Sequence, residues 1–244
     1  MKPRLFDLFC GAGGAAMGYH RAGFEVVGVD IEPQKHYPFE FHQADALTFP
    51  LEGFDAYHAS PPCQHDSVMT RGRWQDRIAS HPDLIKPTHD RLVSLGKPYV
   101  LENVSGAKEK LVNPVMFCGT MFGLQTKAGS QLRRHRYFEM PWFNALTPTC
   151  AHNKYSSIGV YGGGQNPARK RIPATIGVWG HAGGSSKRDD LIQFGTQDRR
   201  DAMGIDWMTS SELSQAIPPA YTEFIGKYLI AELKSLKELK EVRK

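Results

Sequence analysis

The N-terminal residues constrain the fold of this chain more than any other segment. Residues 5–10 (LFDLFC) are almost continuously apolar, as in a buried strand, and Gly11, Gly13 and Gly14 follow at once. Residues 15–22 then show the apolar pattern of a helix. Glycine lets the backbone approach a ligand closely, and the first turn of a helix offers unpaired amides. This order of elements predicts a ligand-binding unit at the start of an α/β domain.

Strand-like and helix-like segments continue to alternate as far as about residue 140. The later strand-like segments are residues 25–29, 41–44, 54–59 and 99–101. Strands that alternate with helices form a doubly wound, mostly parallel sheet. The expected fold class is therefore α/β and Rossmann-like, with a catalytic and cofactor-binding domain at residues 1–140.

Acidic residues follow two of the expected strands. Asp30 comes directly after residues 25–29 and is followed by Ile31, and Asp45 comes after residues 41–44. A carboxylate at a strand's carboxyl end can bind ribose hydroxyls, and a second one can accept from an adenine amino group. The glycines do not form G-x-G-x-x-G and no lysine follows them, so NAD and ATP fit poorly. A different nucleoside cofactor is expected.

A single thiol lies in a proline-rich loop. Cys63 follows Pro61 and Pro62, directly after the strand-like residues 54–59. Proline fixes its own φ and restricts its predecessor, so the thiol should be held in one orientation. Such a thiol suits covalent catalysis. The alternative is a buried structural cysteine.

Four motifs in sequence order carry a resemblance to a known family. They are DLFCGAGG at residues 7–14, an acid after the second strand, PPCQ at 61–64 and ENV at 102–104. In this order they resemble the cytosine-C5 DNA methyltransferases, and the resemblance extends over residues 7–136 and again over 215–221. It implies S-adenosylmethionine as methyl donor. The implied donor-binding residues are Phe9, Gly11, Gly13, Gly14, Asp30, Ile31, Asp45, Pro62 and Gln215.

The resemblance also implies a mechanism. Cys63 would add to C6 of cytosine and so activate C5 towards the methyl group, and Glu102 would assist at N3, which requires a raised pKa. Residues 131–136 resemble an arginine-bearing strand motif, in which Arg134 and Arg136 would share the face towards the base. Leu132 stands where the family usually has glutamine, and Ser214-Gln215 replaces the usual glycine-asparagine.

The character of the sequence changes after residue 140. Residues 141–208 are rich in Gly, Ser, Arg and aromatic residues, and the family places target recognition here. A short echo, IGVYGGG at residues 158–164 and IGVWGHAGG at 176–184, predicts two paired strands. Residues 209–244 should return to the catalytic domain, with a helix at 222–244. The expected DNA-binding residues are Gln64, Arg71, Arg73, Arg169, Lys170 and Arg171, although solvated surface loops look alike.

Composition agrees with a polyanionic partner without requiring one. The net charge is +5 and the sequence pI is about 9.0. The four cysteines, Cys10, Cys63, Cys118 and Cys150, lack metal-binding spacing, so no metal is expected. No apolar run could span a bilayer, and the N-terminus does not resemble a signal peptide. We expect a soluble protein with reduced cysteines, located in the cytoplasm of a bacterium or of a phage-infected host cell.

The function expected from the sequence is therefore DNA (cytosine-5) methylation of double-stranded DNA. A monomer is expected, and a cognate restriction nuclease is a possible partner. Two alternatives stay open: a tRNA cytosine-C5 methyltransferase with the same thiol chemistry, and a catalytically silent DNA-binding relative. Intact Cys63, Glu102 and Arg136 argue against the silent relative.

Overall fold

A computed structural model of the chain describes residues 2–62, 83–153, 157–162, 175–180 and 194–242, and for the two short middle ranges it describes the backbone only. A seven-stranded sheet forms its centre, in the order β3-β2-β1-β4-β5-β8-β6. The five strands β3, β2, β1, β4 and β5 are parallel, whereas β8 is antiparallel to both β5 and β6. The expected α/β fold with a mostly parallel sheet is confirmed.

The bounds of the strands and helices are as follows. The strands of the large sheet are β1 (Arg4–Leu8), β2 (Glu25–Asp30), β3 (Glu40–Gln43), β4 (Ala56–Ala59), β5 (Tyr99–Asn103), β6 (Val115–Phe117) and β8 (Arg136–Glu139). A small sheet contains β7 (Gln131–Leu132), β9 (Ser157–Gly162) and β10 (Thr175–Gly180). The α-helices are α1 (Gly14–Ala22), α3 (Ile85–Ser94), α4 (Thr196–Met203), α5 (Ser210–Gln215) and α6 (Pro219–Val242), and the 3-10 helices are η1 (Ser105–Lys110) and η2 (Gly119–Phe122).

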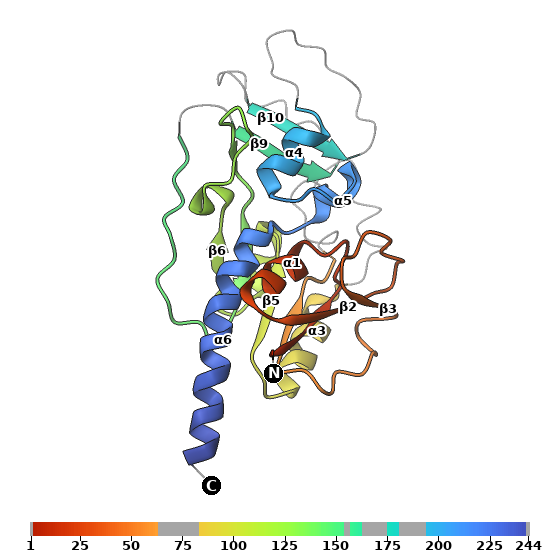
Figure 1. The fold of residues 1–244 in the computed structure, drawn as a ribbon, viewed down its shortest axis with the longest axis vertical. Coiled ribbons are helices and arrows are strands. Elements are labelled where there is room, and N and C mark those ends of the chain that lie inside the picture. Colours follow the sequence, from red (N-terminus) through yellow and green to blue (C-terminus); the bar gives the residue numbers. More distant parts are fainter. Residues whose placement is uncertain (1, 63–82, 154–156, 163–174, 181–193, 243–244) are drawn as a thin grey trace.

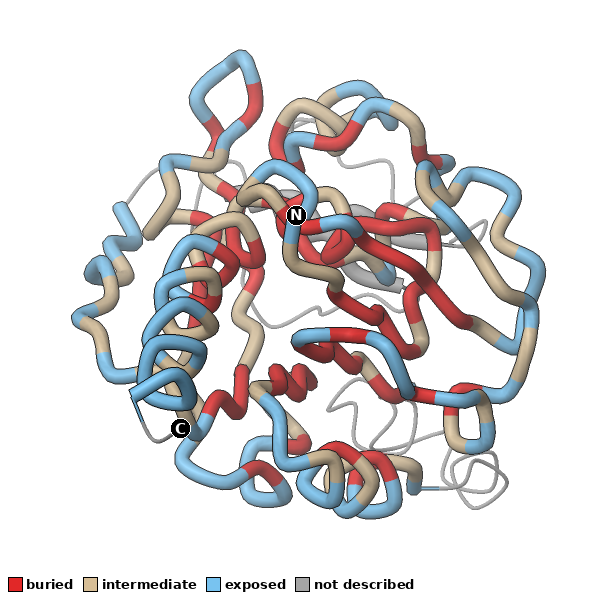
Figure 2. The backbone as a smooth tube through the Cα atoms, turned by 60° about the horizontal axis from the view of Figure 1, so that its bottom comes forward, coloured by how far each residue is buried: buried red, intermediate tan, exposed pale blue. Residues whose placement is uncertain are grey.

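The two faces of the large sheet bury separate apolar clusters. Successive residues of a strand point to opposite faces, so β1, β2, β4 and β5 each contribute to both clusters. One cluster packs under α1 and α6 and includes Leu5, Val26, Ala56 and Val100. The other packs under α3 and includes Phe6, Val27, Tyr57 and Leu101. Figure 2 shows the buried residues concentrated on the sheet and the inner sides of these helices.

Helix α6 returns the C-terminal segment to the first helix of the domain. It lies along α1 and continues beyond the sheet as an isolated rod (Figure 1). Two glycines allow the close approach: a Cβ on Gly18 would lie 2.2 Å from the Pro219 carbonyl oxygen, and one on Gly226 would lie 2.7 Å from the Ala22 Cβ. Within the described part of the chain, no helix is long and apolar enough to cross a membrane.

Several boundaries differ from the sequence-based expectation. Helix α6 begins at Pro219 rather than residue 222, because proline suits the first helical turn. Strand β5 extends to Asn103, so Glu102 is inside the strand rather than after it. Residues 141–208 were expected to be loop-rich and β-rich, yet they also contain α4. The echo at 158 and 176 is confirmed as a strand pair, because Ile158 of β9 is the register partner of Ile176 of β10.

Substitution of Gly18 by alanine tests the α1–α6 contact. The added methyl group would meet backbone atoms that cannot move without separating the helices, so Gly18→Ala should reduce the free energy of unfolding by about 1–3 kcal/mol or more. Urea denaturation measures this. Gly195→Ala is the control, since the nearest atom to its Cβ among the described residues would lie 3.9 Å away. Equal stability of the two variants would contradict the packing described.

Candidate active site

Two of the sequence motifs meet at the carboxyl ends of neighbouring strands. β4 and β5 are parallel partners, with Ala59 beside Leu101. The Asn103 side chain donates from Nδ2 to the Pro61 carbonyl oxygen at 3.1 Å. The Ser60 hydroxyl hydrogen-bonds to the Glu102 carboxylate. The segment that directly precedes Cys63 is therefore fastened to the strand that carries Glu102.

Glu102 is a buried acid with a cationic partner. Its side chain is 7% exposed, and its Oε1 lies 3.0 Å from Nε of Arg136. Burial raises the pKa of Glu102 above its ordinary value, while the charge of Arg136, the Ser60 hydrogen bond and the charge of Arg134 oppose that rise. A carboxyl group under these opposing influences can hold a proton that a free glutamic acid would lose, which meets the requirement for a general acid.

A chain of hydrogen bonds through Tyr19, His58 and Ser60 leads to the Glu102 carboxyl group. The His58 ring lies between the Tyr19 hydroxyl, 3.0 Å from Nδ1, and the Ser60 hydroxyl, 2.9 Å from Nε2. Burial lowers the pKa of His58 to about 3, so the ring is neutral near pH 7. If Ser60 donates to Glu102, it must accept from Nε2–H, and Nδ1 then accepts from Tyr19. Every donor in the chain is used once.

Sequence reasoning assigned no role to the members of this chain. Ser60 was part of the proline-rich run, and Tyr19 sat within an expected helix. The signal that could have found His58 is its place in the apolar segment 54–59, since a histidine on a fully buried strand needs partners.

Arg134 has a different position from the one expected. It does not share a strand with Arg136, because β7 ends at Leu132 and β8 begins at Arg136. The Arg134 side chain is buried and donates to the Ser214 carbonyl oxygen at 2.8 Å, and the Tyr221 hydroxyl donates to the Arg134 carbonyl oxygen at 2.6 Å. Arg134 therefore joins the C-terminal segment to the sheet, and Arg136 makes a direct ion pair with Glu102.

The glycine loop after β1 has the backbone expected of a ligand-binding turn. Phe9, Gly11 and Gly13 all have positive φ, at 57°, 50° and 83°. A non-glycine residue such as Phe9 adopts this conformation rarely, and such strain concentrates at functional sites. Among the described residues, no atom would lie within 4 Å of a Cβ built on Gly11, so they leave open space over this part of the loop. Helix α1 begins at Gly14, one residue before the helical pattern expected at residues 15–22.

The acidic residues flank this loop. Asp30 ends β2 and accepts from the Gly11 amide at 3.0 Å through Oδ2, and from the Glu32 amide at 3.0 Å through Oδ1. Ile31 beside it is a large apolar side chain that is 66% exposed. Asp45 is exposed beyond the end of β3, with Oδ1 2.9 Å from the Leu47 amide. These residues fit a nucleoside: carboxylates for hydroxyl or amino groups, and an apolar surface for a base.

The C-terminal segment closes the other side of the loop. A Cβ on Gly14 would lie 2.4 Å from the Ile217 carbonyl oxygen, so this glycine permits direct backbone packing. The Trp207 ring donates from Nε1 to the Ala12 carbonyl oxygen at 2.9 Å. Gln215 ends α5 and is exposed, two residues before Ile217. The implied donor-pocket segment and the glycine loop are thus neighbours.

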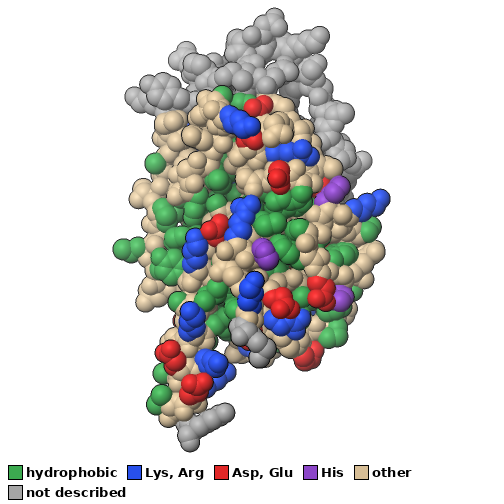
Figure 3. Space-filling model, viewed as in Figure 1, with side chains coloured by type: hydrophobic (Ala, Val, Ile, Leu, Met, Phe, Trp, Pro, Cys, Tyr) green, Lys and Arg blue, Asp and Glu red, His purple; other side chains and the backbone are tan. Residues whose placement is uncertain are grey.

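Other expected site residues lie outside the described residues. These are Cys63, Gln64, Arg71, Arg73, Arg169, Lys170 and Arg171, whereas Pro62 is described and exposed. On the face drawn in Figure 3, the Lys and Arg side chains of the described residues are scattered among acidic and apolar ones rather than gathered in one patch.

Comparison with known proteins shows the fold. No protein-family profile and no curated protein matches the sequence. A solved structure of an E. coli prophage-encoded protein assigned as a DNA modification methyltransferase has a TM-score of 0.56 at 16% identity, covering 95% of this chain and 99% of that one. The methyltransferase EhMeth of Entamoeba histolytica has a TM-score of 0.59 at 15% sequence identity, covering 96% of this chain and 99% of that one. The Dnmt2 methyltransferase of S. pombe has a TM-score of 0.55 at 12% sequence identity, covering 95% of this chain and 99% of that one. The resemblance seen in the sequence therefore holds for the fold over nearly the whole chain.

Removal of the Arg136 charge tests the electrostatics of Glu102. In Arg136→Met the largest influence that lowers the Glu102 pKa is lost, so this pKa should rise further. A carboxyl-carbon NMR titration of Glu102, assigned with Glu102→Gln, measures it. A carboxyl group with a raised folded-state pKa stabilises the protein fully below its unfolded pKa and loses that contribution as pH rises through the folded value. In Arg136→Met this contribution should therefore be lost over a range that extends to higher pH. Within that range the free energy of unfolding should fall by up to about 1.4 kcal/mol per pH unit.

Arg91→Met is the control for this titration, because Arg91 binds the Ala46 and Phe49 carbonyl oxygens beneath the other face of the sheet. It should leave the Glu102 pKa unchanged. An unchanged or lowered pKa in Arg136→Met would show that the ion pair does not govern this acid.

Proposed function

We propose that this chain is an S-adenosylmethionine-dependent DNA (cytosine-5) methyltransferase that acts through a covalent Cys63 adduct. The observation that carries the proposal is the junction of Ser60 and Pro61 with Glu102 and Asn103. This junction brings the residues that precede Cys63 and the acid-bearing motif, about forty residues apart in the sequence, together at the carboxyl ends of β4 and β5. Ligands of open α/β sheets bind at such strand ends.

The chemistry requires an acid and a nucleophile on the same base. C5 of cytosine is too weak a nucleophile to accept a methyl group unaided. The Cys63 thiolate would form a bond to C6 while N3 takes a proton from Glu102, and the C5–C6 π electrons shift towards C5 as an enamine. After C5 is methylated, loss of its proton to a base and departure of the thiolate restore the C5–C6 double bond, and N3 returns its proton to Glu102. Every bond formed to the enzyme is broken again.

The surroundings of Glu102, with Arg136 beside it, suit the role of the general acid in this series of steps. Burial favours the protonated acid before the thiolate adds. Once the proton has moved to N3, the carboxylate left behind lies 3.0 Å from the Arg136 guanidinium, which stabilises the new charge. Ser60 and the neutral His58 hold the carboxyl group in place. Arg134 would act indirectly, by holding the segment that contains Ser214.

The glycine loop, Asp30, Ile31 and Asp45 would hold the donor. When bound, S-adenosylmethionine would supply an electrophilic methyl group. The open space over Gly11 admits a ligand close to the backbone. Asp30 would accept from the ribose, Ile31 would pack on the adenine face, and Asp45 would accept from the adenine amino group. Phe9, Gly13, Gly14, Pro62 and Gln215 would complete the pocket.

The remaining parts of the proposal concern the partner. A cytosine within a duplex must be flipped out of the base stack to reach an enzyme thiol. Gln64, Arg71 and Arg73 would face the DNA near the nucleophile, and the basic residues 169–171 would contact phosphates within a recognition region at 141–208. A monomeric cytoplasmic enzyme, with or without a cognate restriction nuclease, would serve this function.

Trapping with a fluorinated base tests the proposal. The protein is incubated with labelled S-adenosylmethionine and mixed-sequence duplexes that carry 5-fluorocytosine, whose C5 fluorine cannot leave as a proton does. A covalent complex on a denaturing gel is expected, and Cys63→Ser should form none. Glu102→Gln should slow methyl transfer to unmodified DNA by about 10²–10⁴-fold, the usual contribution of a general acid. Glu109→Gln, at an exposed position of η1, is the matched control.

The same experiment with 5-fluorocytosine-containing tRNA separates the alternatives. An adduct with tRNA and none with DNA would replace the DNA proposal by the tRNA one. No adduct with either, together with DNA binding that survives Cys63→Ser, would favour a silent DNA-binding relative.

A further inference from the structure

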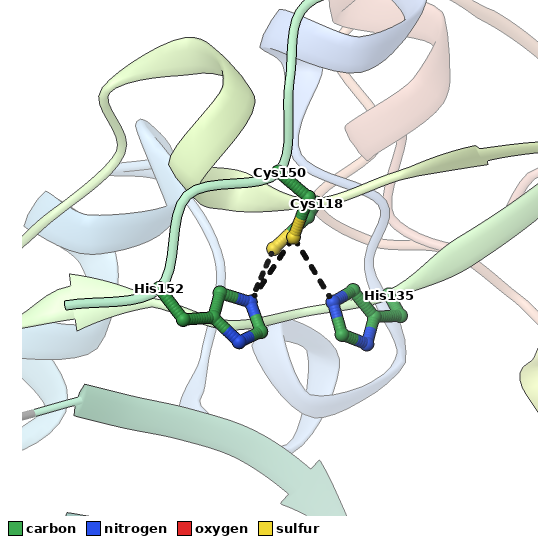
Figure 4. A group of neighbouring side chains, drawn as sticks. All are labelled: Cys118, His135, Cys150 and His152. Atoms are coloured by element: carbon green, nitrogen blue, oxygen red, sulfur yellow. Dashed lines mark hydrogen bonds between the residues drawn. The ribbon is translucent and has the colours of Figure 1, made fainter. Parts of the chain in front are cut away.

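Two cysteines and two histidines outside the candidate active site converge on one point. The ligand atoms of Cys118, His135, Cys150 and His152 all lie within 4.8 Å of one another. Figure 4 shows the two thiols and the two imidazole rings pointing into a common centre from separate parts of the chain. We propose that these four side chains bind a structural zinc ion.

The distances match a tetrahedral site. Zinc–sulfur bonds of about 2.3 Å and zinc–nitrogen bonds of about 2.0–2.1 Å place sulfur and nitrogen ligands about 3.5 Å apart. His152 Nε2 lies 3.3 Å from Cys118 Sγ and 3.2 Å from Cys150 Sγ, and His135 Nε2 lies 3.6 Å from Cys150 Sγ. The side chains therefore need to shift by only a few tenths of an ångström at these pairs.

The ligand set selects the metal and its role. Two thiolates and two imidazoles in a tetrahedral arrangement are typical of zinc. Four protein ligands fill the coordination sphere, so the ion would hold structure and would bind no substrate. Cys118 is buried, Cys150 and His135 are half-buried and His152 is exposed, which leaves a path for the ion from solvent.

Neighbouring groups already support the ligands. The Thr120 hydroxyl lies 3.3 Å from Cys118 Sγ and 3.7 Å from Cys150 Sγ, so it can donate to a thiolate. Gln131 fixes the backbone on both sides of His152: its Nε2 donates to the Ala151 carbonyl oxygen, and its Oε1 accepts from the Asn153 amide. Such outer contacts orient metal ligands.

The location indicates what the ion would do. Cys118 follows β6, His135 precedes β8, and Cys150 and His152 lie on the segment that leads to β9. Zinc would therefore fasten the start of the proposed recognition region to the antiparallel end of the large sheet. His135 also lies between Arg134 and Arg136, so the ion would hold the backbone that carries the partner of Glu102.

The spacing of these four residues in the sequence does not indicate a metal site. Metal sites are usually recognised from pairs of ligands a few residues apart, and only Cys150 and His152 are that close. The other two ligands join them because β6 and β8 are antiparallel neighbours, with Phe117 beside Arg136. That register places Cys118 next to His135, which no spacing rule predicts.

Metal analysis of the full chain tests the proposal. Protein expressed with added zinc, freed of any purification tag and dialysed against metal-free buffer, should contain about one zinc ion per chain, as a closed four-ligand site requires. Cys150→Ser and His152→Ala should weaken zinc binding by more than about 100-fold, because even substitution of outer contacts costs 10–100-fold. Cobalt in place of zinc should give thiolate charge-transfer and tetrahedral ligand-field absorption in the parent protein, which needs no variant to fold.

Two control variants replace one cysteine and one histidine that lie outside the proposed zinc site. Cys63→Ser and His42→Ala should both keep their zinc. Cys63→Ser should also lose methyl transfer, so the zinc content tests this proposal and the methyl transfer tests the proposed function independently. Three results would overturn the proposal: no zinc in the dialysed protein, zinc retained in full by both ligand variants, or a Cys118–Cys150 disulfide in the native metal-free chain.

Discussion

The burial of Glu102 beside Arg136 is the interaction on which the rest of the site depends. A carboxyl group in this position loses hydration, and the strongest stabilisation of its charged form comes from a guanidinium 3.0 Å away. Each partner comes from a different kind of strand: Glu102 from parallel β5, and Arg136 from the start of antiparallel β8. The reversal of direction in the sheet at this point is what brings an acid and its counter-charge together at one strand end.

The remainder of the fold serves to hold that strand end and the glycine loop close together. α1 carries the loop at its start and Tyr19 in its middle, so one helix contributes to both the glycine loop and the hydrogen-bond chain that leads to Glu102. The C-terminal segment returns to press Ile217 against Gly14 and Pro219 against Gly18. Because these contacts use backbone rather than flexible side chains, the two halves of the site are fixed relative to each other.

Much of this was predictable from the sequence, and the exceptions have physical reasons. Residues 5–10 and the glycines predicted β1, the turn and α1, because apolar runs and glycine turns are local signals. The echo at residues 158 and 176 predicted a strand pair that forms in register. Arg134 was wrongly placed on a strand with Arg136, since a charged alternation cannot reveal where a strand stops. The Tyr19–His58–Ser60 chain and the Cys–His cluster were missed because both depend on contacts between distant segments.

Identification of the methylated base tests the central claim most directly. The parent protein and Glu102→Gln are incubated with labelled S-adenosylmethionine and separately with duplex DNA and tRNA, and the nucleosides are released and analysed by mass spectrometry. The account predicts 5-methyldeoxycytidine from the DNA, formed by the parent protein and greatly reduced with Glu102→Gln. Methylation of any other base or position, or equal yields of 5-methyldeoxycytidine from the two proteins, would contradict it.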